Sequence, residues 1–141
     1  IRMRLVGSEM CIRDRPPLTF YEIKRTIDQF QNNESWLLTS AGRFSEKAKM
    51  FPNSVFIIGA DTLMRVFDEK FYDSYDDMIE HIQRFNDHNI NFLVFGRKVG
   101  KKFVSLDKIS VPDIIKDRCT GFEEKSFRDD ISSTTLRLTK D

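Results

Sequence analysis

The sequence is poor in the features that mark several specialised classes of protein. It holds only 2 cysteines, Cys11 and Cys119, which cannot by themselves form a disulfide framework or a four-ligand zinc site. No apolar run approaches the roughly 18 to 20 residues that a membrane span requires. Charge of one sign is not in excess either, because 23 Lys+Arg against 22 Asp+Glu leave a net charge of +1. That balance argues against a nucleic acid or an anionic membrane as the partner of the whole domain.

What is present is typical of a globular domain. Hydrophobic residues make up 40% and charged residues 32% of the 141 residues, which is too apolar for a disordered tail. A chain of this length forms one domain or a piece of a larger one, and it can bury about two-thirds of its unfolded surface. We therefore expect a soluble protein of the cytoplasm or nucleus.

Residues 1–15 differ from the remainder of the chain. They are rich in arginine and show neither a helical nor a strand period. The stretch resembles translated sequencing-adapter read-through, so we interpret residues 1–15 as an artefact or a disordered segment. A transit peptide is the alternative, but Glu9 and Asp14 count against it. Residues 16–141 are then expected to be a partial domain, the C-terminal portion of a longer protein.

Periodicity predicts alternating helices and strands in residues 16–141. Thr19 and Glu22 have the spacing of a capping box, and apolar steps continue that helix to about residue 31. Apolar runs predict strands over 36–38, over 54–58 and over 92–95, with a short strand at 103–104 after a turn. Helices are expected over 44–50, 62–68, 75–85 and 113–119. His81, on the helix expected over 75–85, and His88, just after that helix, are expected at the surface. Lys98, Lys101 and Lys102 are expected at the solvated tip of a hairpin.

The order of these elements predicts the fold class. Two fully apolar strands separated by helices indicate a βαβ unit whose strands are parallel and covered on both faces. The expected fold is therefore α/β, a Rossmann-like open parallel sheet with helices on both faces. Ligands of such sheets bind at the carboxyl ends of the strands, which points to Gly59-Ala60-Asp61 and to Gly96-Arg97.

A hydroxyl-rich segment near the C-terminus predicts an anion site. Ser132, Ser133 and Thr134 precede Arg137 by three to five residues. Hydroxyls at a helix start leave backbone N–H groups pointing outward, and an arginine one turn later can grip a phosphate. By spacing alone, a capped helix with a solvent-facing arginine is the commoner explanation.

Three segments together resemble one family. Ile131-Ser132-Ser133-Thr134-x-x-Arg137 is similar to the I-S-S-T-x-x-R signature of the nucleotidyltransferase superfamily, whose other signature is H-x-G-H. The segment 56–63, FIIGADTL, resembles the strand end of its nicotinamide-nucleotide adenylyltransferase branch, and 92–97, FLVFGR, resembles the strand that follows. The three segments occur in the family's order, and the ordered set is more specific than any one motif.

The resemblance implies roles for individual residues. Ser132, Ser133, Thr134 and Arg137 would bind the triphosphate of ATP. The turn of Gly59, Ala60, Asp61 and Thr62 would lie against the mononucleotide. Asp61 also has a structural explanation as N-cap of a helix that begins at Thr62. Arg97 is either a solvated charge or a phosphate ligand.

The reaction implied is attack by a mononucleotide phosphate on the α-phosphorus of ATP, with release of pyrophosphate. Mg²⁺ would be held mainly by the nucleotide phosphates. H-x-G-H does not occur in the sequence, so no catalytic residue is assigned and the chain alone is expected to be inactive. A tyrosine or phenylalanine at 71–72 stands where relatives carry a stacking tryptophan, although packing into the core is the simpler explanation.

The sequence is also compatible with other functions. A cytidylyltransferase or a phosphopantetheine adenylyltransferase would share the hydroxyl signature, and a nucleotide-binding module without catalysis would keep the phosphate site. The sequence indicates neither the oligomeric state nor the choice between the nicotinamide and nicotinate mononucleotides.

Overall fold

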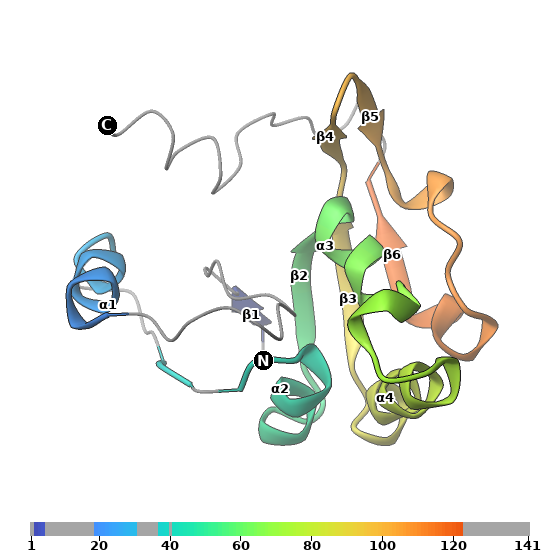
Figure 1. Cartoon of the computed structure of the whole chain (residues 1–141), viewed down its shortest axis with the longest axis horizontal. Coiled ribbons are helices and arrows are strands. Elements are labelled where there is room, and N and C mark those ends of the chain that lie inside the picture. Colours follow the sequence, from blue (N-terminus) through green and yellow to red (C-terminus); the bar gives the residue numbers. More distant parts are fainter. Residues whose placement is uncertain (1, 5–18, 31–36, 40, 123–141) are drawn as a thin grey trace.

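A parallel β-sheet forms the centre of the molecule (Figure 1). The computed structural model describes residues 2–4, 19–30, 37–39 and 41–122. Four parallel strands lie in the order β1-β2-β3-β6, and β4 and β5 form a separate antiparallel pair. The bounds of the strands are β1 (Arg2–Arg4), β2 (Val55–Gly59), β3 (Asn91–Phe95), β4 (Arg97–Val99), β5 (Lys102–Val104) and β6 (Cys119–Gly121).

Helices separate the strands along the chain. The α-helices are α1 (Phe20–Ile27), α2 (Phe44–Met50), α3 (Ala60–Val66) and α4 (Tyr75–Asp87). Three short 3₁₀ helices, η1 (Glu69–Phe71), η2 (Leu106–Lys108) and η3 (Asp113–Arg118), complete the described elements. α3 and α4 connect β2 to β3, which pair in parallel with Gly59 opposite Phe95. The βαβ unit expected from the sequence is therefore confirmed.

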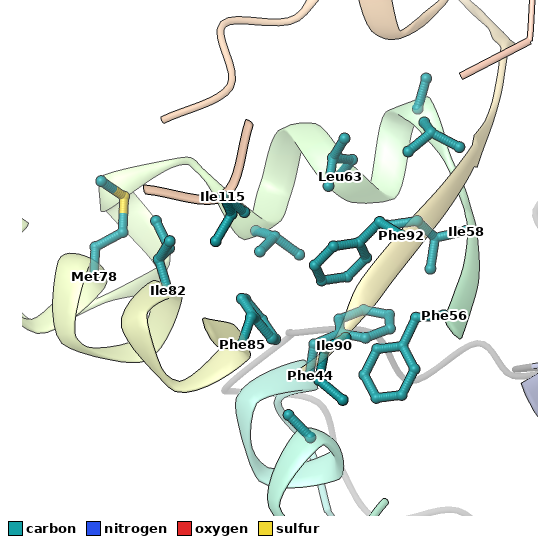
Figure 2. Packing of buried hydrophobic residues seen from close by; sticks show 14 residues of the cluster. Phe44, Phe56, Ile58, Leu63, Met78, Ile82, Phe85, Ile90, Phe92 and Ile115 are labelled. Atoms are coloured by element: carbon teal, nitrogen blue, oxygen red, sulfur yellow. The ribbon is translucent and has the colours of Figure 1, made fainter. Parts of the chain in front are cut away.

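The hydrophobic core lies on one face of the sheet (Figure 2). Phe56 and Ile58 of β2 and Phe92 and Val94 of β3 are buried, and they pack against residues of α2, α3 and α4. The aromatic rings meet edge to face, as in the pair of Phe85 and Phe92 with ring centroids 5.0 Å apart. Edge-to-face packing of this kind adds to the stabilisation from the buried area.

The opposite face of the sheet departs from the expectation of strands buried on both faces. Burial alternates along β2 and β3, and residues such as Ile57 and Leu93 are only half-buried. Among the described residues the strands thus have one fully covered face. The unbroken apolar sequences of β2 and β3 are compatible with a strand buried on one face or on both faces, so they could not predict which of the two occurs.

Local capping signals explain several helix boundaries. The capping box of Thr19 and Glu22 starts α1 as expected, with the Glu22 carboxylate accepting from the Thr19 N–H at 2.7 Å. Ser74 caps α4 by accepting from the N–H of Asp77 at 3.1 Å. The helix over 44–50 is confirmed, as are the strands at 92–95 and 103–104. The turn of the β4–β5 hairpin places Gly100 at φ 62°, a conformation that favours glycine.

Other boundaries differ from the sequence prediction. Leu37 and Leu38 form no strand and are exposed, while Trp36 lies outside the described residues. The helix expected over 62–68 begins two residues earlier, at Ala60, because Gly59 already has the extended backbone of an N-cap. The segment 113–118 is a 3₁₀ helix, and the chain then enters β6, which the sequence analysis missed.

The first residues also differ from expectation. Arg2–Arg4 pair in parallel with β2, with Met3 opposite Phe56, whereas no strand was expected in residues 1–15. The short segment was overlooked because three residues are too few to show a period.

Candidate functional site

The carboxyl edge of the sheet brings together residues from two neighbouring strand ends. β2 ends at Gly59 beside Phe95, the last residue of β3. Asp61 follows Gly59 in the first turn of α3, and Arg97 follows Phe95 as the first residue of β4. Two segments that are 36 residues apart in the chain therefore meet at one edge, as the ligand-site rule for parallel sheets predicts.

The side chains of Asp61 and Arg97 both lie close over the backbone of Gly59. A Cβ atom built on Gly59 would lie 2.5 Å from the Asp61 Oδ1 atom and 3.0 Å from both Cγ and Nε of Arg97. Gly59 has φ −82°, which any residue can adopt, so glycine is needed here for space and not for backbone freedom. We call Gly59, Asp61 and Arg97 the strand-end site. It presents one carboxylate and one guanidinium to the same small volume.

Ala60 and Thr62 point away from this site. Ala60 is fully buried in the core and Thr62 is 3% exposed, because they lie on the inner face of α3. Only their backbone atoms remain for a ligand. Asp61 is not the N-cap, since α3 begins one residue before it; the structural explanation of Asp61 as a cap is therefore wrong.

An aromatic pair lies next to the strand-end site. Phe122 continues the line of β6, with its N–H donating to the Val94 carbonyl at 3.3 Å. Its ring stacks on that of Phe95 with centroids 4.9 Å apart and planes inclined by 22°. Both side chains are half-buried, so the pair forms an apolar wall at the same edge of the sheet.

The hydroxyl-rich segment lies outside the described residues. Its four predicted phosphate ligands are Ser132, Ser133, Thr134 and Arg137. Their position relative to the strand-end site remains a prediction from the sequence.

A second polar group, missed by the sequence analysis, joins α2 to α4. His81 is buried, with 7% of its surface exposed. Its Nε2 atom lies 2.6 Å from Nη1 of Arg43, and its Nδ1 atom lies 2.6 Å from Oγ of Ser45. Asp77 lies 3.5 Å from Nε2 of His81 and 3.9 Å from Nη1 of Arg43. We call Arg43, Ser45, Asp77 and His81 the α2–α4 cluster.

The expectation that His81 lies on the surface is wrong. Its spacing of three from Met78 and four from Phe85 places it at the border of the apolar stripe of α4. That spacing was the available signal. The adjacent Glu80 obscured it, because a charged neighbour suggests a solvated face.

The hydrogen bonds determine the protonation state of His81. A guanidinium can only donate, so Nε2 of His81 must accept from Arg43. Nδ1 then carries the proton and donates to Ser45. Arg84 lies 3.4 Å from Nδ1, too far to compete, and is paired with Glu80 at 2.9 Å. Burial and the nearby guanidinium groups of Arg84 and Arg43 lower the pKa of His81 below 6.5, against the smaller opposing effects of Asp77 and Glu80.

This arrangement excludes Ser45 and His81 as a nucleophile and its base. A general base must offer a lone pair to the serine hydroxyl, whereas Nδ1 of His81 presents a proton to Ser45. The Nε2 lone pair is already occupied by Arg43. The α2–α4 cluster is therefore a structural connection between two helices.

Cys119 is an unreactive thiol. Burial raises its pKa to about 11, so almost none of it is the nucleophilic thiolate at neutral pH. The structural role expected from the sequence agrees with this environment.

Two cavities occur in the described part of the chain, and Phe122 of the aromatic pair is among the residues that line the second. One of about 750 Å³ is bordered by α2 and the end of α4, and one of about 990 Å³ lies between the 105–111 segment and β6. None of the predicted site residues lines either cavity. Within the described ranges no group of three potential metal ligands occurs, and no helix is long and apolar enough to cross a membrane.

Comparison with known proteins adds no assignment. Neither a family model, nor a curated protein, nor a solved structure matches the chain.

Proposed function

We propose that the chain is part of a nucleotidyltransferase that transfers AMP from ATP to nicotinamide or nicotinate mononucleotide, releasing pyrophosphate. The observation that carries the proposal is that the side chains of Asp61 and Arg97 both lie close over Gly59. The two segments that resemble one family thus converge at the carboxyl edge of a parallel sheet. The finer fold assignment, a Rossmann-like sheet with helices on both faces, belongs to the same proposal.

Each residue of the strand-end site has a chemical role in this reaction. The guanidinium of Arg97 neutralises phosphate charge, and its planar fork can donate two hydrogen bonds to one phosphate. The Asp61 carboxylate accepts hydrogen bonds from ribose hydroxyls or from the carboxamide of nicotinamide. Gly59 leaves room for the side chains of Asp61 and Arg97, because it has no side chain of its own. The aromatic pair of Phe95 and Phe122 keeps water from one side of the edge.

The reaction demands alignment more than covalent chemistry. A phosphate oxygen of the mononucleotide forms a bond to the α-phosphorus of ATP while the bond to pyrophosphate breaks. Positioning and charge neutralisation supply most of the acceleration in such transfers. Ser132, Ser133, Thr134 and Arg137 would hold the triphosphate in this proposal.

Mg²⁺ fits the site only as a companion of the nucleotide. Asp61 is a single carboxylate beside a guanidinium, a poor cation site by itself, and the described residues contain no larger ligand group. When bound with ATP, the ion would supply further neutralisation of phosphate charge.

Calorimetric titration with the two pyridine mononucleotides tests the acceptor site. We expect both ligands to bind the chain, and Asp61→Asn to weaken binding by about tenfold, because the site loses a charged hydrogen-bonding partner. Lys49→Gln, an exposed substitution on α2, should leave the affinity unchanged. If neither mononucleotide binds, the proposal is wrong.

Pyrophosphate release tests the reaction and separates the alternatives. The assay uses the complete protein encoded by the gene, with ATP and each acceptor in turn. Release with phosphopantetheine, or with CTP and a phosphorylated alcohol, would identify a sister transferase. Binding of both nucleotides without any release would identify a non-catalytic module.

A further inference from the structure

The β4–β5 hairpin continues from the strand-end site and carries an unusual concentration of positive charge. Arg97 is its first residue, and Lys98, Lys101 and Lys102 are exposed. The hairpin projects beyond the start of α3, at the end of the molecule where β2 and β3 finish (Figure 1). Four of the eight residues from Arg97 to Val104 are cationic.

The strand register divides these cations between two faces. Arg97 pairs with Val104 and Val99 pairs with Lys102. Because directly opposed residues share a face and side chains alternate along a strand, Arg97 and Lys102 lie on the same face as diagonal neighbours. Lys98 pairs with Phe103 on the other face. Lys101 lies in the turn.

The face of Arg97 and Lys102 is the one that meets the strand-end site. The Arg97 side chain lies over Gly59, whereas the ring of Phe103, on the opposite face, covers Gly96. Lys102 therefore extends the cationic surface of Arg97 away from Gly59 along the hairpin. Diagonal neighbours of this kind have Cβ atoms about 7–8 Å apart, a separation that two long side chains can bridge around one ligand.

The charge of Lys102 serves no described internal contact. Within the described part of the chain, no hydrogen bond or ion pair involves its ammonium group, although Lys108 donates to the Phe103 carbonyl at 2.9 Å and Lys70 pairs with Asp68 at 2.7 Å. A bound anion would give the ammonium group of Lys102 a partner of opposite charge.

We propose that Arg97 and Lys102 together bind a chain of linked phosphates, with Lys102 engaging the end farther from Gly59. This inference rests on the proposed function, since the triphosphate of the nucleotide is the polyanion that such a site would take. A single phosphate at Gly59 is held by Arg97. A chain of phosphates carries negative charge along its length, so both cations can donate charge-assisted hydrogen bonds to it.

Binding of inorganic tripolyphosphate and of orthophosphate to the 141-residue chain tests this inference. We expect Lys102→Gln to weaken tripolyphosphate binding about tenfold and orthophosphate binding less than twofold. Lys98→Gln is the matched control, because it removes the same charge from the other face of the same hairpin. It should change tripolyphosphate binding less than twofold. The thermal midpoint of each variant shows whether it folds.

Three results would overturn the inference. Lys102→Gln could bind tripolyphosphate as tightly as the parent chain. Lys102→Gln and Lys98→Gln could weaken tripolyphosphate binding equally, which would indicate only a general electrostatic attraction to the positive charge of the hairpin. Lys102→Gln could weaken orthophosphate binding as much as tripolyphosphate binding, which would indicate that Lys102 contacts a single phosphate.

The failure of this inference can be distinguished from the failure of the proposed function. If Lys102→Gln weakens tripolyphosphate binding and Lys98→Gln does not, the result supports binding of a phosphate chain even if no adenylyl transfer occurs. Adenylyl transfer with no effect of Lys102→Gln on tripolyphosphate supports the reaction and removes Lys102 from it.

Discussion

The α2–α4 cluster and the strand-end site use polar groups in opposite ways. In the α2–α4 cluster, His81 is buried and both of its ring nitrogens are matched within the protein, to Arg43 and to Ser45. At the strand-end site and the hairpin beyond it, charged groups gather at the surface around a glycine with no room for a side chain. Polar groups matched in the interior stabilise the fold, whereas the lysines of the hairpin are exposed, where a ligand can reach them.

The two regions also lie at opposite ends of the sheet. α2 and the end of α4 lie near the start of β2 and β3, and the hairpin lies beyond their carboxyl ends (Figure 1). The hydrophobic core on the buried face of the sheet lies between these two regions. A substitution at one end should therefore affect either the free energy of unfolding or ligand affinity, but not both.

The largest expected effect is on stability, from His81→Ala. The change removes the partner of the buried Ser45 hydroxyl and opens a small cavity in the interface of α2 and α4, while the half-buried Arg43 keeps Asp77 at 3.9 Å. An unmatched buried hydroxyl costs about 1–3 kcal/mol and the cavity adds to that cost, so we expect unfolding in urea to show a loss of about 3 kcal/mol. Tripolyphosphate affinity should stay within twofold of the parent chain. His88→Ala, at the end of α4, is the control and should cost less than about 0.5 kcal/mol.

A smaller effect, on binding, is expected from Gly59→Ala. The new Cβ would collide with Asp61 and Arg97, and both side chains would have to move away from the site. We expect nicotinamide mononucleotide affinity to fall about tenfold, which is about 1.4 kcal/mol. Gly42→Ala is the matched control, since a Cβ there meets nothing within 4 Å. A larger loss of stability than of binding would contradict the separation of the two regions.

The smallest effect comes from a change of pH. The pKa of His81 is lowered by folding from its usual 6.5, so the unfolded chain binds the His81 proton more readily. The stabilisation from neutral His81 is present above about pH 6.5 and is lost as the pH falls towards the folded pKa. Urea unfolding between pH 7.5 and 5 should show this loss, and His81→Gln should reduce it. An NMR titration that puts the pKa of His81 above 6.5 would contradict the lowered pKa on which this prediction depends.

Local features of the sequence predicted much of the fold. The capping box at Thr19, the apolar stripe of α4 and the hydrophobic runs of β2 and β3 were sufficient to place those elements. Errors arose where an element was short, as in β1 and β6, because three residues show no period. The exposed Leu37 and Leu38 show that apolar residues without a pairing partner do not make a strand.

The candidate site was predicted in part. The sequence pointed to Gly59, Asp61 and Arg97 through the strand ends, and the structure brings these three residues together. It did not distinguish them from Ala60 and Thr62, which lie in the core. That distinction depends on where α3 begins, since a shift of two residues rotates the helix by more than half a turn.

Local patterns of residues were sufficient to predict which segments are apolar, that Thr19 caps α1, and that chemistry-bearing residues follow two adjacent strands. Those properties depend on residues close together in the chain. Only the tertiary structure decided that Arg97 lies over Gly59, that Lys102 shares its face, and that His81 is buried between Arg43 and Ser45. Such contacts join residues 36 to 38 positions apart, or depend on strand register, and no local pattern encodes them.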